Sequence, residues 1–135
     1  MDEILEFLIK YCSEAYKKYV FKFTDSEVSS SFGGNAYIML ENDDLKLRFI
    51  NDRGQLMLDF YSKFDKKRDN WYSIDLIRQL ISGENKYYAL LDENNGKFIQ
   101  NNLREILVIF KKDAVEQTIA KLNLLRKKRA KEIFG

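Results

Sequence analysis

The sequence predicts one α+β domain spanning residues 1–135, with an N-terminal helix, an antiparallel β-meander of three to five strands, and two to three C-terminal helices. Apolar residues recur at helical spacing near the N-terminus, alternate with polar residues in the middle of the chain, and return to helical spacing towards the C-terminus. Helices on both sides of a block of strands indicate an α+β rather than an alternating α/β fold. A length of 135 residues fits one domain, and no repeat or interdomain linker divides it.

The first predicted element is an amphipathic helix from Asp2 to about Tyr19. Its apolar positions lie at intervals of three and four residues and comprise Ile4, Leu8, Tyr11, Cys12, Ala15 and Tyr16. Glutamates precede lysines by four positions, the orientation that favours pairing on a helix surface. Cys12 is the only cysteine, so the chain forms no intramolecular disulfide. Its place on the apolar face predicts a buried, unreactive thiol.

Three short strands joined by tight turns form the predicted meander. An apolar run covers residues 36–40, and apolar residues then alternate with polar or solvent-facing ones over 45–49 and 56–60. Turn-forming residues separate these strands at 42–44 and at 51–54. Consecutive strands with tight turns predict antiparallel pairing of neighbours.

The segment before the meander is less regular. Phe21–Phe23 and Glu27–Phe32 predict one or two additional edge strands. The stretch Phe32-Gly33-Gly34-Asn35 has the glycines of a phosphate-binding loop, but it lacks the lysine spacing of such loops and leads into a strand rather than a helix. We interpret it as a glycine-mediated bend.

A charged connector and a short helix follow the meander. Lys63–Asn70 is too polar to pack in a core. Ser73 is placed to cap a helix that has Asp75 in its first turn and Gly83 at its end. The buried stripe of this helix comprises Leu76, Ile77, Leu80 and Ile81. The next segment, 87–91, fits either a strand or a loop.

The last third of the chain predicts two further helices. A turn at Asn94-Asn95-Gly96 precedes a helical pattern formed by Phe98, Leu103, Ile106, Leu107 and Phe110. Asp113 and Glu116 resemble a capping box, so we expect a break there. A second helix then turns inward the apolar residues Ile119, Leu122, Leu125 and Ile133.

The composition argues against an enzyme. The chain contains no histidine, which is the commonest general base and metal ligand near neutral pH. Catalytic triads of the Ser-His-Asp type, Cys-His pairs and histidine-based zinc sites are therefore excluded. We expect no catalytic residues, no metal ligands and no cofactor.

Carboxylate and magnesium chemistry stays open on composition alone. Asp44-Leu45-Lys46 has the acid–spacer–lysine order of some magnesium nucleases and opens a predicted strand, where Asp25 could supply a second carboxylate. Three such triplets occur in the sequence, about as many as chance placement of its acids and lysines gives. We therefore keep the nuclease only as a minor alternative.

Charge is unevenly distributed along the chain. The net charge is +2, with eight basic against twelve acidic residues in 1–65 and fifteen against nine in 66–135. The basic run 126–131 could contact nucleic-acid phosphates, but cations also stabilise the last turns of a helix, and we favour the second interpretation. A small nucleic-acid-binding or regulatory protein that uses this helix is the alternative function, although nucleic acid is not the expected partner.

Candidate partner-binding residues lie in the predicted turns and beside the short helix. Acidic turn residues can project from a rigid sheet, although Asp and Asn are also ordinary turn residues. Arg, Trp and Tyr dominate interface hot spots, although Trp71 could instead pack as a hydrophobic staple onto the helix that follows Ser73. The candidates are Glu41, Asp43, Asp44, Asp52, Arg53, Trp71 and Tyr72.

The sequence predicts a cytoplasmic protein without membrane attachment. No window approaches the roughly 18 apolar residues of a membrane span, and no charged-then-apolar leader opens the chain. Aromatic residues are plentiful, and some of them must reach the surface. Surface aromatics together with the lack of catalytic side chains favour a protein that works by binding.

Four stretches resemble a known class of proteins: 32–36, 48–55, 71–75 and the tail 126–135. They are similar to bacterial immunity proteins of contact-dependent growth inhibition and polymorphic toxin systems. The resemblance implies a non-enzymatic cytoplasmic inhibitor that binds a cognate toxin domain, often a nuclease, and blocks its active site or substrate surface. Many nuclease inhibitors are strongly acidic, whereas this chain is slightly basic, so the resemblance does not extend to overall charge.

Overall fold

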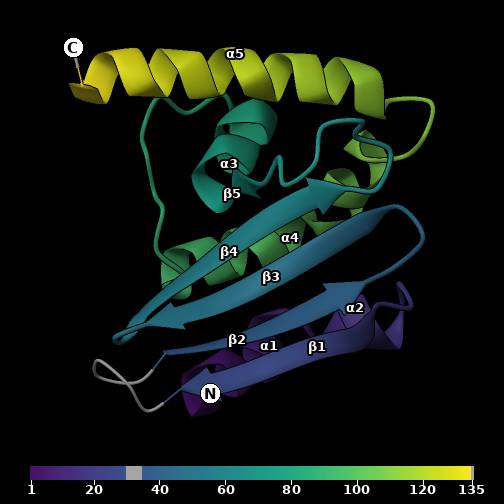
Figure 1. Cartoon of the computed structure of the whole chain (residues 1–135), viewed down its shortest axis with the longest axis vertical. Coiled ribbons are helices and arrows are strands. Elements are labelled where there is room, and N and C mark those ends of the chain that lie inside the picture. The colour runs from purple at the N-terminus through teal and green to yellow at the C-terminus, as the bar shows by residue number, and fades with distance from the viewer. Residues whose placement is uncertain (30–34, 135) are drawn as a thin grey trace.

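The computed structural model describes residues 1–29 and 35–134 and confirms the α+β fold. An N-terminal helical segment is followed by a five-stranded antiparallel sheet and then by three helices (Figure 1). The elements are α1 (Asp2–Tyr11), α2 (Ser13–Lys17), β1 (Lys22–Ser29), β2 (Asn35–Glu41), β3 (Leu45–Asp52), β4 (Gln55–Ser62), β5 (Tyr72–Ser73), α3 (Ile74–Ser82), α4 (Glu93–Ile109) and α5 (Val115–Phe134).

The predicted N-terminal helix is divided in two. Cys12 leaves the helical conformation, with φ −120° and ψ 14°, so α1 ends before it and α2 starts after it. The thiol is nevertheless buried, as predicted from its position on the apolar face. The periodic pattern continues across the break because both helices turn apolar residues towards the same core.

The sheet is a meander with strand order β1-β2-β3-β4-β5, and every neighbouring pair is antiparallel. The two predicted edge segments form one strand, β1, as far as the described residues extend. The Phe32-Gly33-Gly34 bend lies outside them. The β3–β4 turn has positive φ at Arg53 (51°) and Gly54 (88°), as a type I′ hairpin requires. The very short β5 was not predicted.

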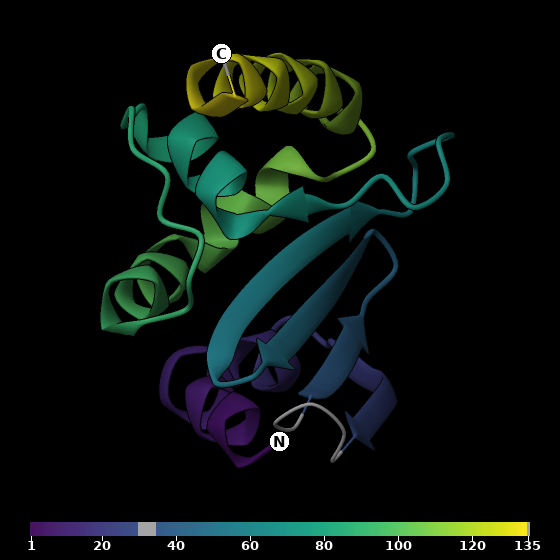
Figure 2. The same cartoon turned by 60° about the vertical axis from the view of Figure 1, so that its left-hand side comes forward.

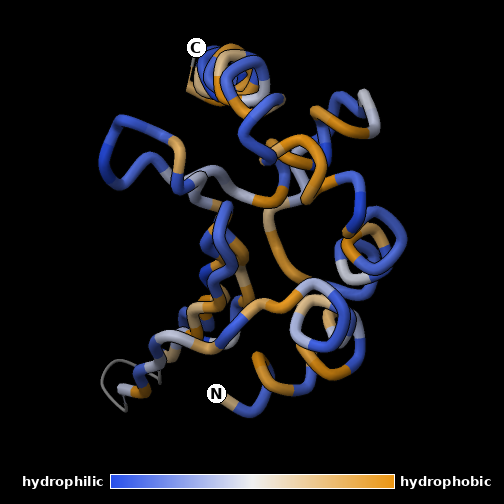
Figure 3. The backbone as a smooth tube through the Cα atoms, turned by 90° about the vertical axis from the view of Figure 1, so that its right-hand side faces the viewer, coloured by the Kyte–Doolittle hydropathy of each residue, from blue (hydrophilic) through white to orange (hydrophobic). Residues whose placement is uncertain are grey.

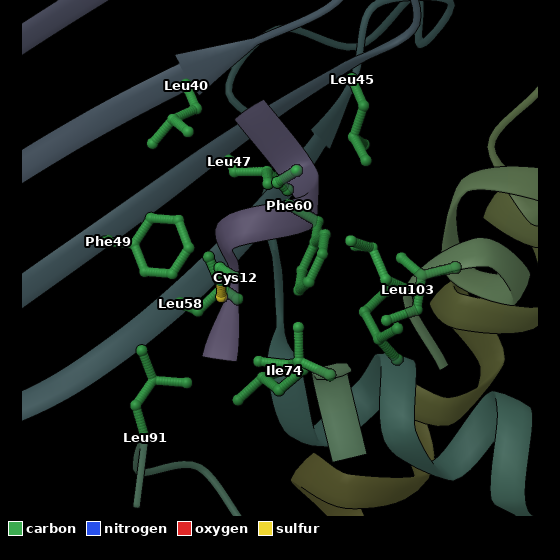
Figure 4. Close-up of a cluster of buried hydrophobic side chains, with 14 of the residues drawn as sticks. Cys12, Leu40, Leu45, Leu47, Phe49, Leu58, Phe60, Ile74, Leu91 and Leu103 are labelled. Atoms are coloured by element: carbon green, nitrogen blue, oxygen red, sulfur yellow. The ribbon is translucent and has the colours of Figure 1, made fainter. Parts of the chain in front are cut away.

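The described helices cover one face of the sheet. Figures 2 and 3 show α1 and α4 on the same side of the strands, with α3 and α5 beyond the β4 end of the sheet. Alternate residues of β2 and β3 are buried on the covered side, which gives the period-2 pattern its physical meaning. The core brings together residues such as Phe49, Phe60, Ile74 and Leu103 (Figure 4). The Phe60 ring stacks on Phe110 with centroids 6.3 Å apart.

The short helix α3 matches its predicted length. Gly83 ends it in the left-handed conformation, with φ 75°, as glycine most readily does. Ser73 immediately precedes the helix, but its hydroxyl donates to the Asp75 carboxylate instead of capping a backbone amide. The 87–91 segment is an irregular loop rather than a strand.

Helix α4 begins earlier than the sequence suggested. The Asn94-Asn95-Gly96 stretch lies inside its first turn, because the Asp92 side chain caps the helix by accepting from the Asn95 amide (2.9 Å). Gly96 lies against the Tyr11 ring, where an added Cβ would come within 2.5 Å. The glycine therefore allows α1 and α4 to approach, and it does not make a turn. The predicted break near Asp113 is confirmed, since it separates α4 from α5.

No helix in the described part of the chain is both long enough and apolar enough to span a bilayer.

Candidate protein-binding face

The sheet face opposite α1 and α4 is not covered by any described helix (Figure 2). We call it the open face. Its residues are those that alternate with the buried positions of each strand or lie opposite such residues in the register. They are Lys22, Asp25, Glu27, Ser29, Asn35, Tyr37, Met39, Glu41, Lys46, Arg48, Ile50, Asp52, Gln55, Met57, Asp59 and Tyr61.

Strand register aligns the open face into rows that cross the sheet. One row runs from Glu27 through Tyr37 and Ile50 to Met57. Directly opposed side chains on one face lie about 4.5–5.5 Å apart, so these residues form a continuous strip. The strip is apolar and aromatic except at its β1 end.

A groove of about 660 Å³ lies over this strip. Side chains of Tyr37, Met39, Ile50 and Met57 provide its apolar lining, while Glu27 and Asp52 lie among its polar margins. Methionine is flexible and adapts to different partners, which suits a binding surface. A groove of this size is comparable to sites that hold several side chains of a ligand.

Arg48 and Trp71 form the other end of the face. The Arg48 guanidinium lies 4.0 Å from the centre of the Trp71 ring, and Nη2 donates to Asp59 Oδ2 at 2.9 Å. Trp71 also contacts Tyr61, with ring centroids 5.4 Å apart. These contacts set Trp71 on the sheet rather than as a staple on α3. A half-buried tryptophan beside an arginine has the composition typical of an interface hot spot.

The β1 edge of the face is acidic. Asp25 and Glu27 are exposed on β1, and Asp25 Oδ2 accepts a hydrogen bond of 2.8 Å from the Tyr37 hydroxyl. This hydrogen bond raises the pKa of Tyr37, and burial and the negative charges of Asp25 and Glu27 raise it further. The phenol therefore stays protonated and donates to Asp25 across the physiological range.

The two predicted hairpin clusters lie at opposite ends of β3. Glu41, Asp43 and Asp44 belong to the β2–β3 hairpin, whereas Asp52 and Arg53 belong to the β3–β4 hairpin. An eight-residue strand is about 26 Å long, so the two clusters cannot form one compact site. They flank the open face instead.

Intramolecular partners already hold several of these hairpin residues. Glu41 accepts from Lys63 at 3.1 Å and lies 3.9 Å from Lys46. The pKa of Glu41 is lowered, chiefly by a hydrogen bond from the Thr24 side chain and further by the two lysines, while partial burial acts in the opposite direction. The two lysines therefore partly neutralise the negative charge that the Glu41 carboxylate presents to a partner.

Tyr72 was expected at the surface, but it is fully buried. Its hydroxyl donates to Asn123 Oδ1 at 2.8 Å and accepts from Asn70 Nδ2 at 2.7 Å, and the Arg126 guanidinium lies 4.3 Å from its ring. Tyr72 therefore attaches α5 to the rest of the fold. In this conformation a partner cannot reach it, and it leaves the candidate site.

The basic run on α5 is partly structural. Arg126 donates to Asn70 Oδ1 (2.8 Å) and to the Trp71 carbonyl (2.7 Å). Arg129 donates to Asp75 Oδ2 (2.7 Å) and to Ser73 Oγ (2.8 Å). Both guanidinium groups thus bind α5 to the start of α3 and to the residues just before it, which reduces the positive surface left for a nucleic acid.

The Asp44-Leu45-Lys46 triplet does not gain a metal-binding environment. Within residues 1–29 and 35–134, no three Asp, Glu or Cys side chains come together as a metal site would require. Asp25, the carboxylate suggested as its partner, instead accepts from Tyr37 on the open face.

Sequence reasoning missed the centre of the face. Tyr37, Met39, Arg48, Ile50 and Met57 were not among the candidates, and the alternation of burial along β2, β3 and β4 in the structure places them opposite the core residues. The missing information was that none of the described helices packs on that side. Period-2 alternation separates the two faces of a strand but does not say which one stays open.

Comparison of the chain with protein-family models, with curated proteins and with solved structures found no match in any of the three.

Proposed function

We propose that this chain is a non-enzymatic immunity protein that binds a cognate toxin domain in the cytoplasm, and that the open face is its binding surface. The resemblance to immunity proteins supplies the class of partner. The structure supplies a surface suited to the task.

The observation that carries the proposal is the uncovered strip of Tyr37, Met39, Ile50 and Met57 beside the stacked Trp71. Aromatic residues, methionine and arginine are the residue types enriched in protein interfaces. They sit on a hydrogen-bonded sheet, so a partner meets a surface that needs little ordering on binding. Contiguous apolar surface with a polar margin is typical of a protein-binding site.

The chemistry of the chain supports binding rather than turnover. The sequence has no histidine, so a reaction at neutral pH would have to rely on carboxylate, lysine, tyrosine or magnesium chemistry. On the open face, Arg48 and Asp59 are paired with each other. An inhibitor needs only complementarity to the toxin surface that it blocks.

Charge on the open face favours a protein over the nucleic-acid alternative. The face carries five acidic side chains, Asp25, Glu27, Glu41, Asp52 and Asp59, against three basic ones, Lys22, Lys46 and Arg48. Phosphate contacts require the opposite balance. A salt titration with RNA and DNA addresses this alternative directly, since binding at low salt through α5 would support it.

Co-expression tests the proposal. The chain is produced together with the toxin encoded by the neighbouring reading frame, and growth and co-purification are measured. We expect wild type to restore growth and to co-purify, and the double variant Ile50→Ser/Met57→Ser to do neither. Val108→Ser/Leu124→Ser is the matched control, because it removes exposed apolar side chains from α4 and α5. Toxicity that persists with wild type, or a purified pair without a complex at micromolar concentration, contradicts the proposal.

A further inference from the structure

We infer that the groove on the open face accepts a partner segment in which a lysine or arginine adjoins an apolar side chain, with the cation between Asp25 and Glu27 and the apolar side chain over Tyr37, Ile50 and Met57. This inference rests on the proposed function and specifies the chemistry of the partner. It places the contact at the β1 side of the sheet.

Asp25 and Glu27 are the acids of the open face that have no ion pair within the described residues. The other three are compensated: Glu41 by Lys63, Asp52 by Arg53 and Asp59 by Arg48. The two acids of the open face without an ion pair therefore both lie on β1, the strand that also carries Lys22.

The spacing of the two acids suits a single cation. They are two positions apart on β1, and their partners in β2 are Met39 and Tyr37. Residues at this spacing point to the same side of a strand and lie about 6.5–7 Å apart. A cation placed between the two carboxylates can contact both of them, which an arginine fork or a lysine ammonium does readily.

Tyr37 joins the acidic edge to the groove. Its hydroxyl donates to Asp25, while its ring lies in the apolar row with Ile50 and Met57. When a residue of the partner places its cation at β1, the adjacent residue of the partner therefore lies over the groove of about 660 Å³. The geometry favours an apolar neighbour, because the groove floor has methionine and isoleucine side chains to bury.

Arg48 does not oppose a cationic partner. Its guanidinium is paired with Asp59 at 2.9 Å and stacked against Trp71. The pair lies towards the β4 side of the face, in the row Asp25–Met39–Arg48–Asp59, where Met39 separates Arg48 from Asp25. Arg48 also lines the groove, but Asp59 compensates its charge, so it leaves the two acids on β1 without a basic partner.

Short peptides test the inference on the intact protein. The probes are acetyl-Ser-Leu-Lys-Leu-Ser-amide and its counterpart with glutamate in place of lysine, titrated to about 10 mM while the amide resonances of the protein are followed by NMR. We expect the lysine peptide to shift Tyr37, Met39, Ile50 and Met57 and to bind about five- to tenfold more tightly than the glutamate peptide. High salt should reduce this preference.

Two double variants isolate the contribution of charge. Asp25→Asn/Glu27→Gln should abolish the preference for lysine while leaving the fold intact, because both residues are exposed. Asp113→Asn/Glu116→Gln changes the net charge equally at exposed positions near the α4–α5 turn and should retain the preference. A preference that survives the first variant, or is lost in the second, overturns the inference.

Three other outcomes also overturn it. They are equal affinity for both peptides, shifts confined to residues outside the open face, and displacement of the lysine peptide by oligouridine of about eight nucleotides. The last result would make the occupant a nucleic acid. The two failures are distinguishable, because growth rescue by wild type can be absent while the lysine preference holds, or present while the two peptides bind equally.

Discussion

Arg48 is the register partner of Asp59 across the β3–β4 pair, and its guanidinium lies 4.0 Å from the centre of the Trp71 ring. Three segments therefore meet at one point of the open face. Arg48 comes from β3, Asp59 from β4, and Trp71 directly follows the Lys63–Asn70 connector. The connector looked too polar to pack, yet the residue that follows it is anchored by an aromatic ring on a guanidinium. Any partner that covers Arg48 must therefore also contact or displace Trp71.

Trp71 should report on the state of the open face. It is the only tryptophan, so intrinsic fluorescence comes from this site. Removing the stacked guanidinium in Arg48→Ala should expose the ring to water and shift its emission to longer wavelength, with a loss of about 1 kcal/mol in the free energy of unfolding. Arg104→Ala, on α4, is the control and should leave the spectrum unchanged. An unshifted spectrum in Arg48→Ala would show that the two side chains do not stack in solution.

Arg129 should be essential for stability although it belongs to a basic run. Its partner Asp75 is only 2% exposed, so Arg129→Met leaves a buried carboxylate without its guanidinium. Breaking such a pair costs about 3–5 kcal/mol, measured as the free energy of unfolding in urea. We expect a loss at the lower end of this range, because the Arg129 side chain is 27% exposed and water partly screens its charge.

Lys128→Met provides the comparison on the same helix. Lys128 is 57% exposed and lies 3.9 Å from Glu132, a geometry that contributes about 0–1 kcal/mol. If both variants unfold at the same urea concentration, the Arg129–Asp75 pair does not hold α5 in place.

Gly96→Ala should destabilise the protein even though alanine is the better helix former. The new Cβ would meet Tyr11 ring carbons at 2.5–2.7 Å, which forces α1 and α4 apart. We expect a net loss of about 1–3 kcal/mol on thermal or urea unfolding. In a Tyr11→Ser background the same change should be neutral or stabilising, by up to about 1 kcal/mol. Equal effects in both backgrounds would rule out the contact with Tyr11.

The buried thiol should make stability fall at alkaline pH. Burial raises the pKa of Cys12 from 9.0 to about 12, because the thiolate is disfavoured away from water. Below pH 9 the thiol is protonated in both states and its contribution is fully present. Between pH 9 and 12 the unfolded state ionises first, so stability decreases by up to about 1.4 kcal/mol per pH unit.

Cys12→Ala isolates this contribution. Its free energy of unfolding should change less between pH 9 and pH 10 than that of wild type, because tyrosines with a raised pKa, such as Tyr72, contribute equally to both slopes and the difference belongs to Cys12. Native wild type should also resist thiol reagents at pH 8 and react only as it unfolds. Identical slopes for the two proteins, or rapid labelling of the native state, would show that the thiol is accessible.

Much of the fold could be predicted because its local patterns agree with its tertiary contacts. Alternation in β3 and β4, the turn at Arg53-Gly54 and the stop at Gly83 are local features with a direct structural meaning. The start of α4 could not be predicted in the same way. The local sequence around Gly96 is typical of a turn, and only the contact with the Tyr11 ring, which is distant in sequence, explains why the helix has a glycine there.

The candidate site was predicted less completely, for a related reason. Asp52, Arg53 and Trp71 do flank the open face, but Tyr72 is enclosed by α5 through contacts with Asn123 and Arg126, some 50 residues away. Residue type alone does not separate a hot-spot tyrosine from a buried one. Long-range packing decides which aromatic residues reach the surface, and the sequence gives no local sign of it.

The most direct measurement is calorimetric titration of the purified chain with the toxin domain from the neighbouring reading frame. Wild type and Val108→Ser/Leu124→Ser should bind with the same affinity, at a Kd of about 1 μM or tighter, and Ile50→Ser/Met57→Ser should bind at least about 100-fold more weakly. Absence of binding by wild type, or undiminished affinity in the open-face variant, would contradict the proposal that the chain acts by docking a protein on this face of the sheet.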